Sequence, residues 1–333
     1  MTDGLPVEIS VIMPVRNERQ SVEAALDSVF SQIVDAGFEV LTIDGRSEDG
    51  TRQILDARSR KDHRLRVFDN PFRIAGSALN IGLAEAVGKF WVRVDSHSIM
   101  PDNYLQILVG HLRSGQSEAA GGIVKGYGVS PFGRATAALQ DTRFGMGNAS
   151  HHYATETAYV DHLSHGMYRL DLSREIGGFD GGLLRNQDYE FDYRFGLAGG
   201  RILLDHTASF HREVRESPTR LARQFYDYGY WKYIVLRRHP QSLHLRWLAP
   251  PLLVAGLGIG AAFCWTAIGR RLLAALGVSY LAVVGAGTTA AGRTLGARSL
   301  PHAALAMITM HVAWGSGFLR SAVTSVFPRR VQA

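Results

Sequence analysis

An acidic residue and a histidine stand two positions apart after a short apolar run, in the segment Phe90-Trp91-Val92-Arg93-Val94-Asp95-Ser96-His97. A carboxylate and a neutral imidazole are both ligands for divalent cations. Side chains at i and i+2 of an extended strand leave the same face, so Asp95 and His97 are expected to project together. This spacing favours a metal site of the kind that binds a diphosphate, although Asp-x-His also arises by chance in many proteins.

The elements that must position these side chains follow a regular alternation. Strands are predicted at 7–15, 38–44, 65–68 and 90–94, and helices at 22–30, from 51 through 55, and at about 77–87, with Ser21 as the N-cap of the first helix. This order predicts βαβ units, and therefore an α/β fold with a mostly parallel sheet flanked by helices. Ligands of such sheets bind beyond the carboxyl ends of the strands. Glu18, Asp44 and Asp95 all stand at those ends, so we expect them to meet at one edge.

The second half of the soluble region is less regular. Glycine-rich turns are predicted around residues 121–124, 164–168 and 176–180, and a helix over 186–197. That helix contains an acidic cluster, Asn186-Gln187-Asp188-Tyr189-Glu190. Glu190 and Arg194 are four residues apart on it, which is the spacing of an intrahelical ion pair.

Composition narrows the possible partners. The chain has 333 residues and a net charge of +6, which suits a phosphate-bearing substrate, a membrane surface or nucleic acid. The single cysteine, Cys264, excludes an intramolecular disulfide and a cysteine-rich zinc site. The first residues contain neither a basic segment nor a long apolar one, so no secretory signal is predicted and the first domain is expected in the cytosol.

The end of the chain is apolar. Segments 247–268, 272–291 and 300–319 each approach the ~20 residues that span a bilayer, and they predict about three transmembrane helices over 247–325. A basic and aromatic stretch at 216–246 precedes them, which is typical of a membrane interface. The predicted domains are therefore 1–215, 216–246 and 247–325. A soluble helical core domain is the alternative for the last of these.

Four motifs occur in a diagnostic order: Pro14-Val15-Arg16-Asn17-Glu18, Asp44-Gly45-Arg46-Ser47-Glu48-Asp49-Gly50-Thr51, Asp95-Ser96-His97 and Asn186-Gln187-Asp188-Tyr189-Glu190. This order resembles the family 2 inverting glycosyltransferases with the GT-A fold, over residues 7–215. The apolar tail and the region from Gln224 to Lys232 resemble bacterial exopolysaccharide glycosyltransferases of the succinoglycan type.

The resemblance implies roles on the donor side. Pro14 and Glu18 match the loop that holds the nucleotide, and Asp44 matches the carboxylate that recognises the base, expected to be uracil. Asp95 and His97 match the Asp-x-Asp motif that binds Mn²⁺ or Mg²⁺. A distant histidine completes this metal site in some relatives, and His211 is the first candidate, with His206 second. Arg73 either approaches the diphosphate or is a solvated loop residue.

The resemblance also implies roles on the acceptor side. Asp188 matches the general base, and Gln187 stands where the family usually has glutamate. Gln224 and Trp231 match the acceptor and interface region. The processive relatives carry Gln-x-x-Arg-Trp there, and Gln224-Phe225-Tyr226-Asp227 lacks the arginine, so one sugar per encounter is expected. Ser164-His165-Gly166 either forms a wall of the acceptor site or is a plain turn.

The expected protein is a metal-dependent inverting glycosyltransferase of a bacterial inner membrane, with its catalytic domain in the cytosol. It would transfer a sugar from a UDP-sugar to a polysaccharide or a lipid-linked acceptor of the polyprenyl diphosphate type. A nucleotidyltransferase would need a glycine-rich loop after the first strand, which Arg16-Asn17-Glu18 is not. A non-catalytic membrane scaffold would need none of the three aspartates, Asp44, Asp95 and Asp188. Nucleic acid is not an expected partner, because the basic stretch adjoins the membrane segments.

Overall fold

The structure is a computed structural model that describes residues 5–147 and 149–326, and these residues form two compact units. Unit 1 contains the residues up to 125 together with 154–212. Unit 2 contains 126–153 together with the chain from 213 onward. The segment 126–153 thus leaves unit 1 and joins unit 2. No change of composition marks its two ends, and the domain boundaries predicted at 215 and 246 do not include it.

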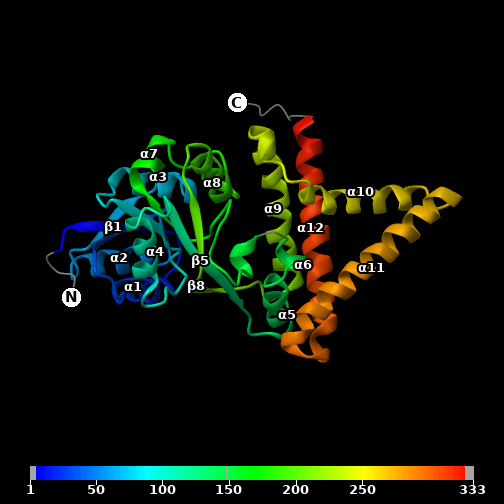
Figure 1. Cartoon of the computed structure of the whole chain (residues 1–333), viewed down its shortest axis with the longest axis horizontal. Coiled ribbons are helices and arrows are strands. Elements are labelled where there is room, and N and C mark those ends of the chain that lie inside the picture. The colour runs from blue at the N-terminus through cyan, green and yellow to red at the C-terminus, as the bar shows by residue number, and fades with distance from the viewer. Residues whose placement is uncertain (1–4, 148, 327–333) are drawn as a thin grey trace. The chain divides into compact units, whose positions relative to one another are not determined.

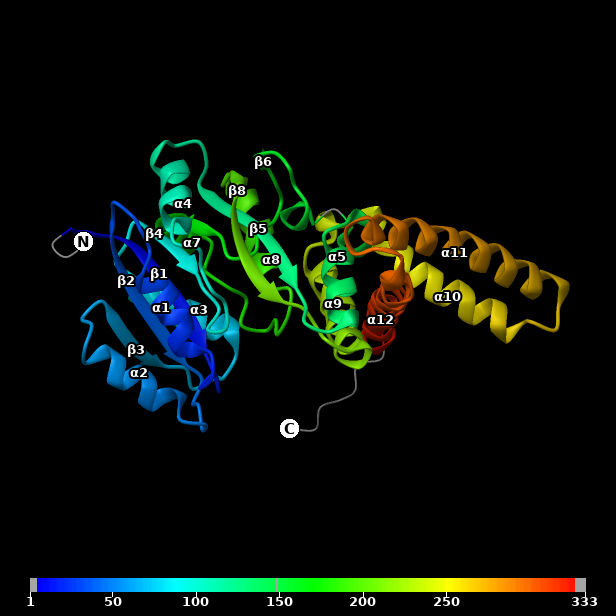
Figure 2. The ribbon, with the colours of Figure 1, turned by 90° about the horizontal axis from the view of Figure 1, so that it is seen from below.

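An eight-stranded sheet forms the centre of unit 1, with the last residues of β5 and β8 continuing into unit 2 (Figures 1 and 2). Its order is β3-β2-β1-β4-β7-β5-β8-β6. The strands are β1 (Val7–Val15), β2 (Gly37–Asp44), β3 (Leu65–Asp69), β4 (Phe90–Arg93), β5 (Ala119–Tyr127), β6 (Ala158–Tyr159), β7 (Met167–Arg169) and β8 (Ile202–Glu213). The neighbouring strands β3, β2, β1 and β4 pair in parallel. β7 is antiparallel to both β4 and β5, and β6 is antiparallel to β8. The predicted α/β fold is confirmed, and the sheet as a whole is mixed.

Helices cover both faces of this sheet. They are α1 (Val22–Phe30), α2 (Thr51–Ser59), α3 (Ala75–Glu85), α4 (Tyr104–Arg113), α7 (Leu170–Glu175) and α8 (Gln187–Leu197). One core contains side chains of α1, α2 and α4, and the other contains side chains of α3, α7 and α8. Alternate residues of β1 divide between them, since Val11 and Met13 enter the first core and Ile12 the second. Ser21 precedes α1 but does not cap it, because its hydroxyl donates to Glu18 Oε2 at 2.7 Å.

The glycine-rich segment 121–124 lies inside β5. The turns predicted around it do not form there. A Cβ at Gly122 would lie 2.5 Å from the carbonyl oxygen of Ala208 in the neighbouring β8. A Cβ at Gly121 would lie 3.0 Å from Leu163. These glycines therefore permit close strand packing, which is the other common reason for glycine inside a strand.

Trp91 of β4 fixes α7 and α8 against the sheet. Its indole nitrogen donates to Ser173 Oγ at 2.7 Å. Its ring stacks on Tyr168 at 5.1 Å and meets Phe179 and Phe191 edge-on at 5.9 and 5.8 Å. Such buried aromatic pairs add about 1 kcal/mol each beyond their burial. The helix with the acidic cluster is thereby held beside the strand that leads into Asp95.

Asp205 of β8 is a buried carboxylate whose contacts are sensitive to acid. His111 Nε2 lies 2.7 Å from its Oδ2, and the hydroxyl and amide of Thr207 donate to its Oδ1. Burial alone would raise the pKa of Asp205, but these hydrogen bonds lower it to about 2. Because the folded pKa is depressed, this stabilisation is present above about pH 4 and is lost as the pH falls toward 2.

We therefore expect Asp205→Asn to destabilise the purified protein by about 2 kcal/mol at pH 7, and by about half as much at pH 3. The measurement is the thermal unfolding midpoint of variant and wild type across this pH range. A difference between the two proteins that stays the same at pH 3 and pH 7 would contradict the assignment.

Unit 2 is helical. Its helices are α5 (Pro131–Gln140), α6 (Arg143–Met146), α9 (Pro218–Arg238), α10 (Ala249–Ala262), α11 (Ala267–Leu295) and α12 (Leu300–Val326), and a short 3₁₀ turn at Leu245–Leu248 leads into α10. α9 and α12 lie side by side in both views (Figures 1 and 2). A Cβ at Gly229 would lie 2.0 Å from the Trp314 carbonyl oxygen, and one at Gly317 would lie 2.0 Å from that of Tyr226. The two helix backbones are thus nearly in contact at these glycines.

Two stretches of unit 2, Leu245–Ala262 and Ala267–Leu295, are long and apolar enough to cross a membrane. The second contains the predicted segment 272–291, whereas the first ends at Ala262 and not at residue 268 as predicted. Large apolar side chains on them are exposed, including Leu252, Ile268 and Leu281. This exposure favours lipid as their surroundings over the core of a soluble domain. A third span through α12 remains a prediction.

Candidate active site

The parallel strands bring the predicted loops together at one edge of the sheet. Val15 pairs with Asp44 at the ends of β1 and β2. Ile12 pairs with Arg93, and its carbonyl accepts the amide of Val94 at 3.1 Å. The segments that follow β1, β2 and β4 therefore start side by side, as the position of ligand sites in such sheets predicts.

The loops after β1 and β2 are interlocked. The Asn17 amide donates to Ser47 Oγ at 2.9 Å, and Asn17 Oδ1 accepts the Glu48 amide at 2.9 Å. The Glu18 amide donates to Thr51 Oγ1 at 2.9 Å. Asn17 has a positive φ of 55°, a conformation that asparagine tolerates better than most residues. These bonds hold Glu18 beside the second loop, whereas Pro14 lies inside β1 itself.

Asp44 is buried, with 3% of its surface exposed, and organises the second loop. Ser47 Oγ donates to its Oδ1 at 2.5 Å, and the Ser47 amide lies 3.3 and 3.2 Å from the two carboxylate oxygens. Its main-chain carbonyl accepts the Asn70 amide at 2.8 Å. Asp44 thus makes a local turn of the Asx kind and joins the loop that carries Arg73.

Arg73 has a positive φ of 61°, and its guanidinium lies 3.8 Å from Glu48 Oε1. Arg16 NH1 donates to its carbonyl at 3.4 Å. Backbone conformations of this kind in residues other than glycine often occur at functional sites. Arg73 therefore belongs to the same group of loops as Asp44.

Asp95 is held between a guanidinium and an imidazole. Arg93 Nε donates to its Oδ1 at 2.8 Å, and His165 Nε2 lies 3.1 Å from its Oδ2. Burial alone would raise the pKa of Asp95, but the charges of Arg93 and His165 hold it well below its usual range. The carboxylate is therefore ionised and oriented before any ligand binds.

The triplet itself is not extended. β4 ends at Arg93, and the Ser98 amide closes a turn onto the Asp95 carbonyl at 2.9 Å. His97 lies in this turn, with 54% of its side chain exposed and its Nδ1 3.5 Å from Glu18 Oε1. The expectation that Asp95 and His97 project together from a strand is wrong, because the strand stops too early.

His165, not His211, contacts Asp95. His211 pairs through its backbone with Ile99, and its side chain is exposed. The preceding residue, Phe210, is buried and packs on the His165 ring at 4.1 Å. Successive residues of a strand face opposite sides, so His211 faces away from His165. His206, the second candidate, has its Nδ1 3.0 Å from the Thr157 hydroxyl.

His165 is fixed on several sides. Its φ is +57°, Ser164 Oγ lies 2.9 Å from its Nδ1, and Tyr104 donates to its carbonyl at 3.0 Å. The sequence offered two interpretations of this segment, a wall or a plain turn, and neither predicted the contact with Asp95. A polar side chain inside a glycine-rich turn was the available signal.

We expect His165→Asn to lower kcat/KM about tenfold, because a polar contact with a charged group contributes about 1.5 kcal/mol. Asparagine is chosen because it tolerates the left-handed backbone. The control is His206→Asn, on the exposed part of β8, which should stay within about twofold of wild type. Equal effects of the two variants on initial rates would contradict a role for His165.

Asp188 lies in the first turn of α8, after Asn186, whose φ is +57°. It is half-buried, and its Oδ1 accepts the Tyr189 amide at 2.8 Å. Burial lowers the pKa of Arg93, but the charges of Asp95 and Asp188 raise it above its usual value. One guanidinium therefore lies within electrostatic range of both carboxylates.

Two neighbours of Asp188 on α8 form an ion pair. Arg194 donates to both carboxylate oxygens of Glu190, at 2.7 and 2.8 Å, which confirms the expected intrahelical pair. Gln187 is 6% exposed, and its Oε1 has no hydrogen-bond partner among the described residues.

Gln224 and Trp231 belong to α9 of unit 2. Gln224 Nε2 donates to the Tyr228 hydroxyl at 3.0 Å. The Trp231 ring lies 6.0 Å from that of Tyr230, edge-on. Their acceptor and interface roles remain predictions.

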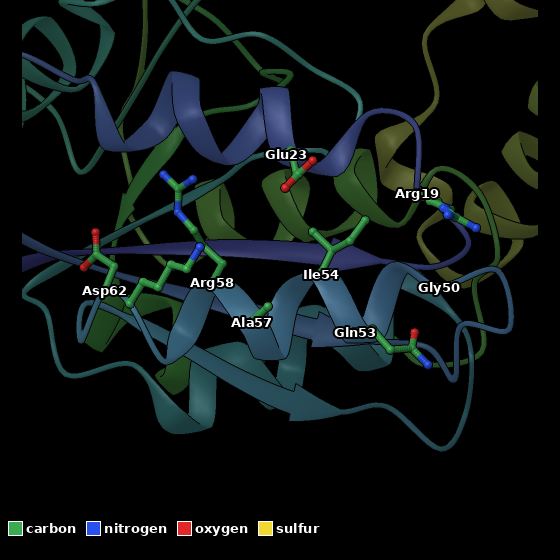
Figure 3. A pocket seen from close by; sticks show the side chains of 9 residues that line it. Arg19, Glu23, Gly50, Gln53, Ile54, Ala57, Arg58 and Asp62 are labelled. Carbon is green, nitrogen blue, oxygen red and sulfur yellow. The ribbon is translucent and has the colours of Figure 1, made fainter.

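A shallow groove of about 700 Å³ lies between α1 and α2 (Figure 3). It is lined by Arg19, Glu23, Gly50, Gln53, Ile54, Ala57, Arg58, Lys61 and Asp62. Arg58 pairs with Asp27 at 2.9 Å, and Asp62 pairs with Arg64 at 2.7 Å. The groove includes none of the residues predicted for the site. The charges of Arg58 and Asp62 in its lining are already neutralised by these ion pairs.

The carboxylate and imidazole groups around Asp95 would provide some, but not all, of the ligands that Mg²⁺ or Mn²⁺ needs. Among the described residues, no group of three His, Cys, Asp or Glu side chains forms a complete metal site. Mg²⁺ is typically bound by one or two carboxylates together with substrate phosphates and water. Asp95, His97 and Glu18, which lies 3.5 Å from His97, would supply only part of such a coordination sphere.

Comparisons with known proteins agree with this architecture. The model of the family described as Glycosyl transferase family 2 matches residues 10–176. Succinoglycan biosynthesis protein ExoA of Rhizobium meliloti (strain 1021) is 31% identical over 96% of this chain and 96% of its own length. A dolichyl N-acetyl-α-D-glucosaminyl phosphate 3-β-D-2,3-diacetamido-2,3-dideoxy-β-D-glucuronosyltransferase of Methanococcus voltae is 23% identical over 73% of this chain and 77% of its own.

A solved structure shares the fold. The mannosyltransferase PcManGT from Pyrobaculum calidifontis, in complex with GDP-Man and Mn²⁺, matches with a TM-score of 0.60 and 16% identity. The match covers 96% of this chain and 90% of that one.

Proposed function

Because this chain belongs to glycosyl transferase family 2, we propose that it transfers a sugar from a UDP-sugar to a lipid-linked glycan or polysaccharide, with inversion and with a divalent cation. Its membership confirms the resemblance in the sequence and removes the nucleotidyltransferase alternative. The name of the Rhizobium relative supports a role in exopolysaccharide synthesis, and that of the Methanococcus relative supports a polyprenyl-type lipid phosphate acceptor.

Asp188 is the proposed general base. A carboxylate within hydrogen-bond reach of an acceptor hydroxyl removes its proton as the oxygen attacks the anomeric carbon. The bond to the diphosphate breaks on the opposite side of that carbon, so the configuration inverts. Asp188 is half-buried and its carboxylate is oriented by the Tyr189 amide, which supports this role.

Asp44, Glu18 and Arg73 are the proposed nucleotide contacts. The buried Asp44 carboxylate suits the N3–H of uracil, and Arg73 suits phosphate oxygens. Asp95 and His97 are proposed to hold Mn²⁺ or Mg²⁺, and His211 of β8, whose backbone pairs with Ile99, is proposed as a further ligand. When bound, the cation would neutralise charge on the leaving diphosphate.

The observation that carries the proposal is the shared guanidinium of Arg93. It donates to Asp95 and lies within electrostatic range of Asp188. The groups that bind the sugar donor and the group that activates the acceptor must lie on either side of the bond that breaks. Arg93 interacts with one of each, Asp95 and Asp188. Its positive charge also lowers the pKa of the Asp95 carboxyl and so favours its ionised form.

Unit 1 is proposed to face the cytosol, with α10 and α11 in the membrane. Arg237, Arg238 and Arg246 flank the first apolar helix, and an excess of basic residues marks the cytoplasmic side of such helices. Addition of one sugar per encounter is proposed because Asp227 stands where processive relatives have arginine.

The test is a donor screen with the full chain in detergent. UDP-sugars and GDP-sugars are incubated with Mn²⁺, Mg²⁺ or a chelator, and released nucleotide is measured with and without a polyprenyl diphosphate-linked glycan. We expect release from a UDP-sugar that needs the cation and rises with the acceptor. Release from GDP-sugars alone would overturn the donor assignment, and release in chelator would overturn the metal.

A further inference from the structure

Two histidines of unit 1 lie beside an aspartate in different ways. His111 Nε2 lies 2.7 Å from Asp205 Oδ2 and forms a hydrogen bond with it. His165 Nε2 lies 3.1 Å from Asp95 Oδ2, yet this buried nitrogen forms no hydrogen bond within the part of the chain that the structure describes. The distance would allow one, so the carboxylate oxygen must lie off the direction in which Nε2 donates. The contact between His165 and Asp95 therefore needs another explanation.

A divalent cation bound by both side chains would explain this contact. Mg²⁺ takes octahedral coordination with bonds of about 2.1 Å, so two ligands at adjacent corners stand about 3.0 Å apart. Seen from one such ligand, the other lies about 45° away from the direction of the metal. The distance of 3.1 Å between His165 Nε2 and Asp95 Oδ2 agrees with this separation. The oxygen also lies off the direction of Nε2, as expected if the cation occupies that direction.

The surroundings of the imidazole suit a metal ligand. Ser164 Oγ lies 2.9 Å from His165 Nδ1, and a ligating histidine normally donates from its other nitrogen to a second group of this kind. With the proton on Nδ1, the neutral ring keeps a lone pair on Nε2 for a metal. The ring packs on Phe210 at 4.1 Å, and Tyr104 donates to the main-chain carbonyl of His165 at 3.0 Å. The imidazole is thus held in place before a cation binds.

The two carboxylate oxygens of Asp95 have different partners. Arg93 Nε donates to Oδ1 at 2.8 Å, whereas Oδ2 is the oxygen beside His165. The side chain of Asp95 is 19% exposed, so the pair is not sealed from solvent. Asp95 and His165 would supply one oxygen and one nitrogen, and phosphate oxygens and water typically fill the other positions around such a cation. A site of two side chains also agrees with the finding that no three His, Cys, Asp or Glu residues in the described ranges form a metal site.

We propose that His165 Nε2 and Asp95 Oδ2 are adjacent ligands of the divalent cation. This inference rests on the proposed function, because the diphosphate of the sugar donor would complete the coordination. It adds to the site a ligand that the motif Asp95-Ser96-His97 does not contain. His165 comes from the turn before β7, so two loops that are distant in the sequence would hold the same cation.

The first test measures affinity for Mn²⁺. The full chain in detergent is titrated with Mn²⁺ in the presence of UDP, and free Mn²⁺ is followed by electron paramagnetic resonance. We expect His165→Asn to raise the Kd for Mn²⁺ at least tenfold, the usual effect of losing a group that supports a metal site. The matched control, His111→Asn, removes a histidine–aspartate contact outside the strand-end loops and should stay within about twofold of wild type. An unchanged Kd in His165→Asn, or equal changes in both variants, would overturn the proposal.

A second measurement identifies the bound atom. Electron spin-echo envelope modulation detects a nitrogen bonded directly to Mn²⁺, and His97→Asn/His211→Asn removes the other two histidines proposed for the site. We expect nitrogen modulation to persist in this double variant at saturating Mn²⁺ and UDP. Because the double variant retains His165, this result does not depend on whether His165→Asn folds.

The outcomes separate this proposal from the proposed function. Bound Mn²⁺ without nitrogen modulation in His97→Asn/His211→Asn would overturn the assignment of His165 and leave the proposed function unaffected. Failure of wild type to bind Mn²⁺ in the presence of UDP would overturn both.

Discussion

Asp188→Asn is expected to lower kcat about a thousandfold with little change in the KM for the donor. A positioned general base contributes about 10²- to 10⁴-fold, and asparagine keeps the shape but cannot accept the proton. The loss should appear in kcat because proton removal belongs to the transition state. The measurement is sugar transfer to acceptor at saturating donor.

The matched control for Asp188 is Asp171→Asn, on the exposed part of α7, where the carboxylate pairs with Arg169. Exposed ion pairs contribute about 0–1 kcal/mol, so this variant should fold and work normally. Donor hydrolysis without acceptor should be less affected by Asp188→Asn than transfer. If Asp188→Asn keeps more than a tenth of wild-type transfer, Asp188 is not the base.

Asp95→Asn is expected to lower kcat/KM about 10²- to 10³-fold, the usual effect of losing one group that stabilises developing charge. It should also raise the concentration of Mn²⁺ that gives half-maximal activity. This second readout separates loss of a metal ligand from a general loss of structure. Binding of Mn²⁺ in the presence of donor, followed by electron paramagnetic resonance, is the direct measurement.

The chain offers a close control for this substitution. Asp62 also pairs with an arginine two positions away, Arg64, and its side chain is 19% exposed, as is that of Asp95. Asp62→Asn therefore removes a comparable ion pair outside the strand-end loops. If both variants lose activity to the same extent, Asp95 acts through stability and not through the donor.

The sequence predicted most of the elements of unit 1 and the edge where the site lies. Strand periodicity placed the ends of β1 and β2 correctly and that of β4 one residue too late, and parallel pairing then required Glu18, Asp44 and Asp95 to be neighbours. It did not predict the partners of Asp95. The contact with His165 joins residues seventy positions apart through a turn whose backbone is left-handed, and local patterns do not encode such a contact.

Two other errors have the same origin. The local preference of glycine predicts turns around Gly121 and Gly122, whereas close packing against β8 and Leu163 determines their place. Ser21 was assigned as a cap, but Glu18 competes for its hydroxyl. In each case a contact beyond the local window outweighs local propensity.

The near contact of α9 and α12 also has a consequence for how the chain is made. Leu221 and Phe225 of α9 are buried in one cluster with Ala306 and Met310 of α12, and α12 leaves the ribosome only after α9, α10 and α11. Until then α9 has no cover for its apolar side, and chaperones and proteases act on such exposed surfaces. A stop codon anywhere before α12 should therefore be as damaging to the amount of protein in the cell as one near the start of the gene.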